Sequence, residues 1–115
     1  MNAPSPNENG VYPSTESIVL PRTTKGWRGA PVAEIDLCDL GDRWLWAIGF
    51  QLMQGDCHGR SSPLTERQSA PTRADALALA IADLRTAMTG KESRDAAAIL
   101  EWLKSFNPSQ MSLFA

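Results

Sequence analysis

The feature that most constrains the fold is the alternation of apolar and polar residues in two neighbouring segments. In segment 31–38, PVAEIDLC, the apolar residues Ala33, Ile35 and Leu37 fall on one side of an extended chain. Segment 43–53, RWLWAIGFQLM, repeats this period over a longer run. Its large apolar side chains share one side: Trp44, Trp46, Ile48, Phe50 and Leu52. A period of two is typical of half-buried strands, so both segments are predicted to be β-strands.

The residues between these strands predict a hairpin. Residues 39–42, DLGD, are typical of a turn, and they leave a loop of about four residues. The expected register pairs Leu37 with Trp44, Ile35 with Trp46 and Ala33 with Ile48, so that the apolar faces coincide. A slip of one residue would place the tryptophans beside Glu34 and Asp36 and is disfavoured.

A third, weaker strand is predicted after a second turn at residues 54–57. It covers residues 58–67, HGRSSPLTER, and is mostly polar. Pro63 lies inside it and cannot donate a hydrogen bond to a neighbouring strand. We therefore expect this strand at an edge of the sheet, or interrupted by a bulge.

Two helices are predicted in the C-terminal half. Thr72 with Asp75 three residues later is typical of a helix start, and Gly90 is a natural stop. Between them apolar residues recur at helical spacing: Leu77, Ile81, Leu84 and Met88. Ser93 is expected to cap a second helix over residues 94–106, which Asn107 and Pro108 would end.

These elements predict an α+β fold, an antiparallel β-meander of about three strands packed against two C-terminal helices. Residues 1–26 are rich in Pro, Ser, Thr and Asn and are expected to be a mostly disordered arm. Residues 17–20 are its one apolar island and could add a short edge segment to a sheet. The α+β domain is expected over residues 27–106, and residues 107–115 are expected to be a tail.

Composition limits the classes of function. The chain has 115 residues, 43% of them hydrophobic, which suits one domain with a modest core. Its formal net charge of −2 gives no electrostatic reason to expect strong binding to nucleic acid phosphates. The first residues do not resemble a signal peptide, and no apolar run approaches the length of a membrane span. A cytoplasmic location is the expectation.

The residues that could support catalysis or bind a metal are few. Cys38, Cys57 and His58 are at most three zinc ligands, where a structural zinc site needs four. The hairpin register also separates the two cysteines too far for a disulfide. We expect Cys38 to be buried or half-buried and Cys57 to lie in a turn. No glycine-rich phosphate loop or Ser-His-Asp order is present, so the prediction is a protein that is not an enzyme, with no catalytic residue, no metal and no cofactor.

Two further patterns could indicate nucleic acid binding. Trp44, Trp46 and Phe50 could stack on bases, but Arg43 is the only basic residue among those that flank them, and a core face is the favoured interpretation. Basic residues that could touch phosphates near the start of the domain are Arg22, Lys25, Arg28 and Arg43. A second loose group is Arg60, Arg67 and Arg73. Acidic residues interleave with the first group, so solvated surface is the default interpretation for it.

The C-terminal tail carries the one pattern that points to a partner. Its residues are Gln110, Met111, Ser112, Leu113 and Phe114. This segment resembles the bacterial sliding-clamp-binding motif, whose usual form is Gln-Leu-Ser/Asp-Leu-Phe. Met111 departs from the usual Leu, although Met is also apolar and flexible. The resemblance covers five residues and implies that the Gln side chain hydrogen-bonds at one pocket while Leu113 and Phe114 fill an apolar one.

The resemblance implies an accessory or adaptor protein of bacterial DNA metabolism that binds the sliding clamp. A general resemblance to small accessory proteins of plasmids and integrated elements also suggests a mobile-element origin. The alternative is a small nucleic-acid-binding or antitoxin-like regulatory module, with the tail folded onto the second helix. A dimer is left open, through the edge of the third strand or through the face that carries Leu45 and Met53.

Overall fold

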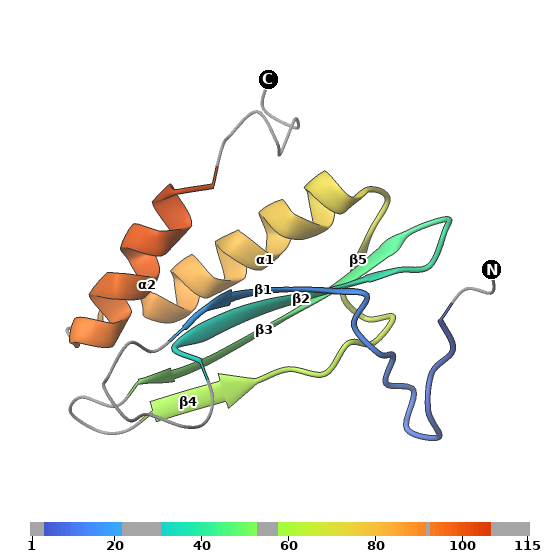
Figure 1. Cartoon of the computed structure of the whole chain (residues 1–115), viewed down its shortest axis with the longest axis horizontal. Helices are drawn as coiled ribbons and strands as arrows, with labels where there is room; N and C mark the ends of the chain where they lie inside the picture. The colour runs from blue at the N-terminus through green and yellow to red at the C-terminus, as the bar shows by residue number, and fades with distance from the viewer. Residues whose placement is uncertain (1–3, 22–30, 53–57, 92, 107–115) are drawn as a thin grey trace.

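The computed structural model describes residues 4–21, 31–52, 58–91 and 93–106. It is an α+β fold, as predicted, in which a five-stranded antiparallel sheet carries two helices on one face (Figure 1). The strands are β1 (Glu16–Leu20), β2 (Ala33–Asp39), β3 (Trp44–Leu52), β4 (His58–Ser61) and β5 (Ser69–Ala70). The helices are α1 (Arg73–Met88) and α2 (Arg94–Lys104). The strand order is β1-β2-β3-β4, and β5 also pairs with β3.

The β2–β3 hairpin is present, but its predicted register is wrong by two residues. Leu37 pairs with Trp46, and Ile35 pairs with Ile48. The turn begins one residue later than expected, because Asp39 still belongs to β2 and accepts a hydrogen bond from Gly41 N at 2.9 Å. Gly41 has φ +92°, a conformation that favours glycine. A shift of two keeps every side chain on its face, so the apolar faces coincide as expected.

The predicted third strand is shorter than expected and lies at an edge of the sheet. β4 ends at Ser61, and Pro63 follows in a segment that leaves the ladder. The chain returns to β3 further along, where Trp46 N donates to Gln68 O at 3.0 Å and β5 begins. β4 and β5 therefore pair with the same edge of β3, on either side of a bulge that contains Pro63.

The short edge segment considered for residues 17–20 is present: Glu16–Leu20 form β1 and pair antiparallel with β2, within the arm that was otherwise expected to be mostly disordered. The apolar side chains of Ile18 and Leu20 are half-buried against the helix-side core and favour this pairing. The preceding residues are also bound to the domain, because Tyr12 N donates to Leu64 O and Thr15 N donates to Leu37 O. The sheet thus begins before the predicted domain start at residue 27.

Both helices start as predicted. The Thr72 hydroxyl accepts a hydrogen bond from Asp75 N at 3.1 Å, and the Ser93 hydroxyl accepts one from Ala96 N at 3.0 Å. Such caps satisfy backbone N–H groups that have no partner within the helix. Gly90, with φ +81°, follows α1 at the expected stop. The second helix ends two residues earlier than predicted, at Lys104.

The main core lies between the sheet and the helices. Ile35, Leu37 and Ile48 from the sheet pack with Leu77, Leu84 and other residues of the helices, all nearly inaccessible to solvent. Trp44 and Trp46 are half-buried against this core, as the core interpretation predicted. Trp46 Nε1 is buried and has no hydrogen-bond partner within the described part of the chain.

A second, smaller core lies on the opposite face of the sheet. Cys38, Leu45 and Ala47 are fully buried there beneath Leu64, with Tyr12 packed alongside. Leu45 was considered above as part of a possible dimer surface. The bulge between β4 and β5 covers it instead, because the chain crosses this face where it leaves the ladder. Met53 lies outside the described residues.

Neither helix of the described chain combines the length and the apolar character that crossing a membrane requires.

Candidate functional site

Most of the residues predicted to bind partners lie outside the described part of the chain. These are the clamp-motif residues Gln110, Met111, Ser112, Leu113 and Phe114, and the basic residues Arg22, Lys25 and Arg28. The helix that precedes the motif is complete, because α2 ends at Lys104 and the Ser105 hydroxyl donates to Trp102 O at 2.6 Å. Trp102 and Phe106 then pack edge to face, with ring centroids 5.3 Å apart.

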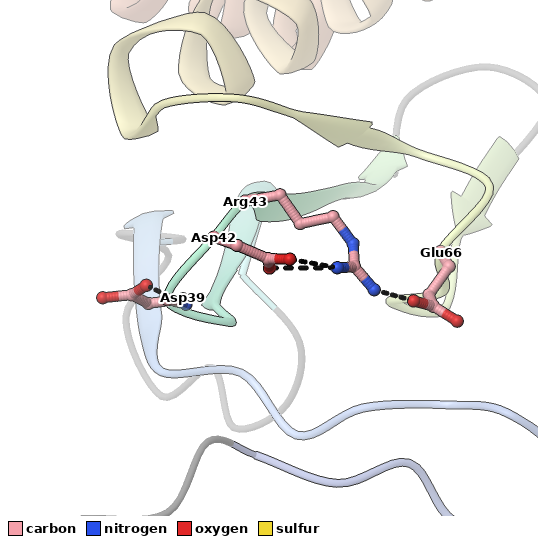
Figure 2. A network of polar contacts seen from close by, with 5 residues as sticks. Asp39, Asp42, Arg43 and Glu66 are labelled. Carbon is pink, nitrogen blue, oxygen red and sulfur yellow. Dashed lines mark hydrogen bonds and ion pairs between the residues drawn. The ribbon is translucent and has the colours of Figure 1, made fainter.

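Arg43 is the one member of the first basic group that the structure describes, and two carboxylates hold it. Its Nη1 donates to both carboxylate oxygens of Asp42, at 2.9 and 3.0 Å. Its Nη2 forms an ion pair with Glu66, which belongs to the bulge between β4 and β5 (Figure 2). A phosphate would have to displace these carboxylates, so the arrangement suits a link between two loops better than a nucleic acid contact.

The second basic group is not a patch. Arg73 at the start of α1 binds the β1 carboxylate of Glu16 through two hydrogen bonds, of 2.8 and 2.5 Å. Arg60 lies on β4, at the opposite edge of the sheet, where it binds Asp83 at 3.0 Å. Its guanidinium carbon also lies 5.9 Å from the centre of the Phe50 ring. These two arginines therefore hold α1 to the two edges of the sheet.

A pair of carboxyl groups that was not predicted as a site lies on the sheet face opposite the helices. Glu34 and Asp36 occupy alternate positions of β2, so their side chains share this face. The Glu34 carboxylate reaches over β3, where a Cβ placed on Gly49 would lie 3.9 Å from Glu34 Oε1. Asp36 accepts a hydrogen bond of 2.7 Å from the Ser17 hydroxyl of β1.

Glu34 on β2 and Glu16 on the neighbouring strand β1 have opposite electrostatic environments. Partial burial raises the pKa of Glu34, and the charge and hydrogen bond of Asp36 add to this effect. The hydrogen bonds from Arg73 lower the pKa of Glu16, against a smaller opposing effect of burial. The spacing of Glu34 and Asp36 could have revealed the carboxyl pair, because residues two apart on a strand always share a face.

Cys38 is buried as predicted, in the second core. Burial raises the pKa of its thiol, with a smaller effect from Asp39. The fraction of reactive thiolate at neutral pH is therefore low. Within the described residues, no three His, Cys, Asp or Glu side chains come together as a metal site. The side chains of Cys57 and His58 lie outside the described part.

A surface cavity of about 650 Å³ lies between the N-terminal segment and the bulge. Tyr12 and two prolines, Pro6 and Pro63, supply apolar surface, while Glu66 and Arg67 belong to its polar lining. Glu66 is also the partner of Arg43, so the cavity adjoins the ion pairs of Figure 2. Its lining does not select one class of ligand.

The fold and these sites define an α+β protein with an antiparallel sheet. No known family, curated protein or solved structure matches the chain in the comparisons.

Proposed function

We propose that this chain is a non-enzymatic accessory or adaptor protein of bacterial DNA metabolism or of a mobile element. It binds the replication sliding clamp through residues 110–114. The observation that carries the proposal is the match of Gln110, Ser112, Leu113 and Phe114 to the clamp-binding motif. Met111 keeps the apolar character of the one position that differs.

The arrangement of the domain is compatible with such a tail. The buried core of the described chain is built from side chains between Val32 and Leu103, so those residues already enclose a core ahead of the motif. A peptide that follows a completed helix can bind in an extended conformation, with its apolar pair as the anchor. Tethering by a tail raises local concentration, and it does not require the domain itself to bind DNA.

The competing proposal, a nucleic-acid-binding or antitoxin-like module, has less support. A sheet with helices on one face suits many functions, and fold alone does not choose among them. Arg43 is held by Asp42 and Glu66, and Arg60 and Arg73 each bind a carboxylate of the domain. Mobility shifts with duplex and single-stranded oligonucleotides at low salt test this competing proposal directly.

Calorimetry with a purified bacterial sliding clamp tests the clamp proposal. We expect a micromolar Kd for the full chain and loss of detectable binding for the Leu113→Ala/Phe114→Ala variant, because the apolar anchors are removed. A matched control is Leu79→Ala, which truncates an exposed apolar side chain of α1 and should leave the affinity unchanged. The proposal is wrong if the clamp binds a control peptide but not this protein, or if removing residues 109–115 leaves the affinity unchanged.

A further inference from the structure

The two edges of the sheet differ in how open they are to pairing. One edge is short and broken, because β4 has four residues, β5 has two, and the Pro63 bulge separates them. The other edge is β1, which pairs with β2 alone among the described strands. In a strand, alternate backbone N–H and C=O groups point away from the neighbour, so an edge strand is a template for another strand.

Within its five residues, β1 carries few of the features that commonly protect an edge strand. Its sequence, ESIVL, contains no proline, glycine, lysine or arginine. Its one charged residue, Glu16, is neutralised within the chain by Arg73. Val19 is 45% exposed on the face opposite the helices, while Ile18 and Leu20 are only half-buried on the helix side. Both faces of the sheet therefore reach this edge with incompletely covered apolar side chains.

We infer that β1 is a homodimer interface, at which the β1 strands of two copies pair antiparallel and join their sheets into one. The strand can pair with a second copy of itself in the register centred on Ile18. There Ile18 lies opposite Ile18 of the second copy, Ser17 opposite Val19, and Glu16 opposite Leu20. The two Glu16 carboxylates lie at opposite ends of this short ladder, so like charges do not face each other.

The length of β1 favours a second copy as the occupant. Pro13 and Pro21 lie on either side of the strand and donate no backbone hydrogen bond, which limits the length of a regular ladder. A second β1 has the same length and the same flanks, and it offers Ile18 and Leu20 to extend the helix-side core across the interface. This surface differs from the two considered from the sequence, since Leu45 is buried and the β4 edge is broken.

Sedimentation equilibrium of the full chain, from low to several hundred micromolar protein, tests the inference. A ladder this short belongs among small interfaces, so we expect a Kd on the order of tens of micromolar. Val19→Lys should weaken dimerisation by about tenfold or more, because an edge lysine opposes strand pairing. Leu79→Lys is the matched control: Leu79 is 44% exposed on α1, and the substitution adds the same charge away from the edge.

A second measurement tests the register and does not depend on Val19→Lys. With Cys57 replaced by Ser, Ile18→Cys places two thiols opposite each other in the dimer, at a separation that a disulfide can span. Mild oxidation should link Ile18→Cys chains much faster than Leu79→Cys chains. A monomer at every concentration, or equal effects of the edge and control variants, would overturn the inference. The Leu113→Ala/Phe114→Ala variant should dimerise like the unmodified chain, so this result is separate from clamp binding.

Discussion

The two faces of the sheet are built from the same strands, but they are covered in different ways. On the helix side, α1 and α2 cover a continuous apolar core, and charged residues lie at its borders in ion pairs. On the other side, the N-terminal segment and the bulge cover only a small core around Cys38 and Leu45. The remainder of that face carries Glu34 and Asp36, which are only partly buried.

This difference shows how neighbouring elements determine the behaviour of identical side chains. Glu16 and Glu34 lie on adjacent strands, but α1 brings an arginine to one, while β2 brings a second carboxylate to the other. Their pKa values therefore move in opposite directions. The helix side is a packed core with an ion-paired glutamate at its border, and the opposite side carries a partly buried glutamate whose neighbour is a second carboxyl group.

The largest expected effect is on the helix side. Ile35 is fully buried there and pairs with Ile18 on one neighbouring strand and with Ile48 on the other. Ile35→Ala should lower the free energy of unfolding by about 3–5 kcal/mol, because three strands and a helix layer limit collapse into the cavity. Urea unfolding followed by circular dichroism measures this, with Ile35→Val as a control that should cost about 1 kcal/mol. A loss below that of the control would show that this core is loosely packed.

The second core should tolerate truncation better. Leu64 is 5% exposed and covers Cys38, Leu45 and Ala47 from the bulge. Leu64→Ala should cost about 2 kcal/mol, because a loop can move toward the cavity more easily than a strand within a sheet. The same unfolding measurement applies, together with the rate at which Cys38 reacts with a thiol reagent, which should rise. An effect as large as that of Ile35→Ala would remove the difference between the two faces.

The parts of the fold that follow from local patterns were predictable from the sequence. The two-residue spacing of Trp44, Trp46 and Ile48 identified the core face of β3. The capping residues Thr72 and Ser93 located both helix starts. These features depend on residues that are close in sequence. The predicted register of β2 against β3 was wrong by two residues. A shift of two leaves every side chain on the same face of the sheet, so the apolar pattern does not distinguish the two registers, and the turn geometry at Asp39 determines which one forms.

Features that depend on distant parts of the chain were not predicted. The cover of Leu45 comes from Leu64 and Tyr12, whose sequence surroundings show no pattern of burial. The separation of Arg60 from Arg73 likewise follows from the strand order, since they lie near opposite edges of the sheet. The carboxyl pair was predictable in position from the spacing of Glu34 and Asp36, but its environment depends on how β3 and β1 pair with β2.

The Glu16–Arg73 ion pair should make a smaller contribution than either core. Both side chains are more than a third exposed, so solvent screens the interaction. Glu16→Gln should cost a few tenths of a kcal/mol to about 1 kcal/mol at neutral pH. The pKa of Glu16 is lowered in the folded state, so this stabilisation is present above the ordinary value of 4.5 and is lost as pH falls through the folded value. Unfolding curves of the two proteins should therefore converge in acid, and a pH-independent difference would assign the effect to packing.

The smallest expected effect has the opposite sign. Glu34 has a raised pKa, so its contribution to stability is present below 4.5 and is lost as pH rises through the folded value. The residues of β1, β3 and β4 that share the sheet face of Glu34 are uncharged: Ser17, Val19, Gly49, Gln51, Gly59 and Ser61. Among the described residues, this leaves Asp36 as the charged neighbour of Glu34. Glu34→Gln should raise the free energy of unfolding at neutral pH by a few tenths of a kcal/mol, since it removes the repulsion with Asp36 at a partly exposed site. Below pH 4.5 the gain should disappear, because the protonated Glu34 of the unmodified chain is then equally neutral. If Glu34→Gln instead destabilises the protein at neutral pH, the carboxylate has a cationic partner, and the contrast with Glu16 is lost.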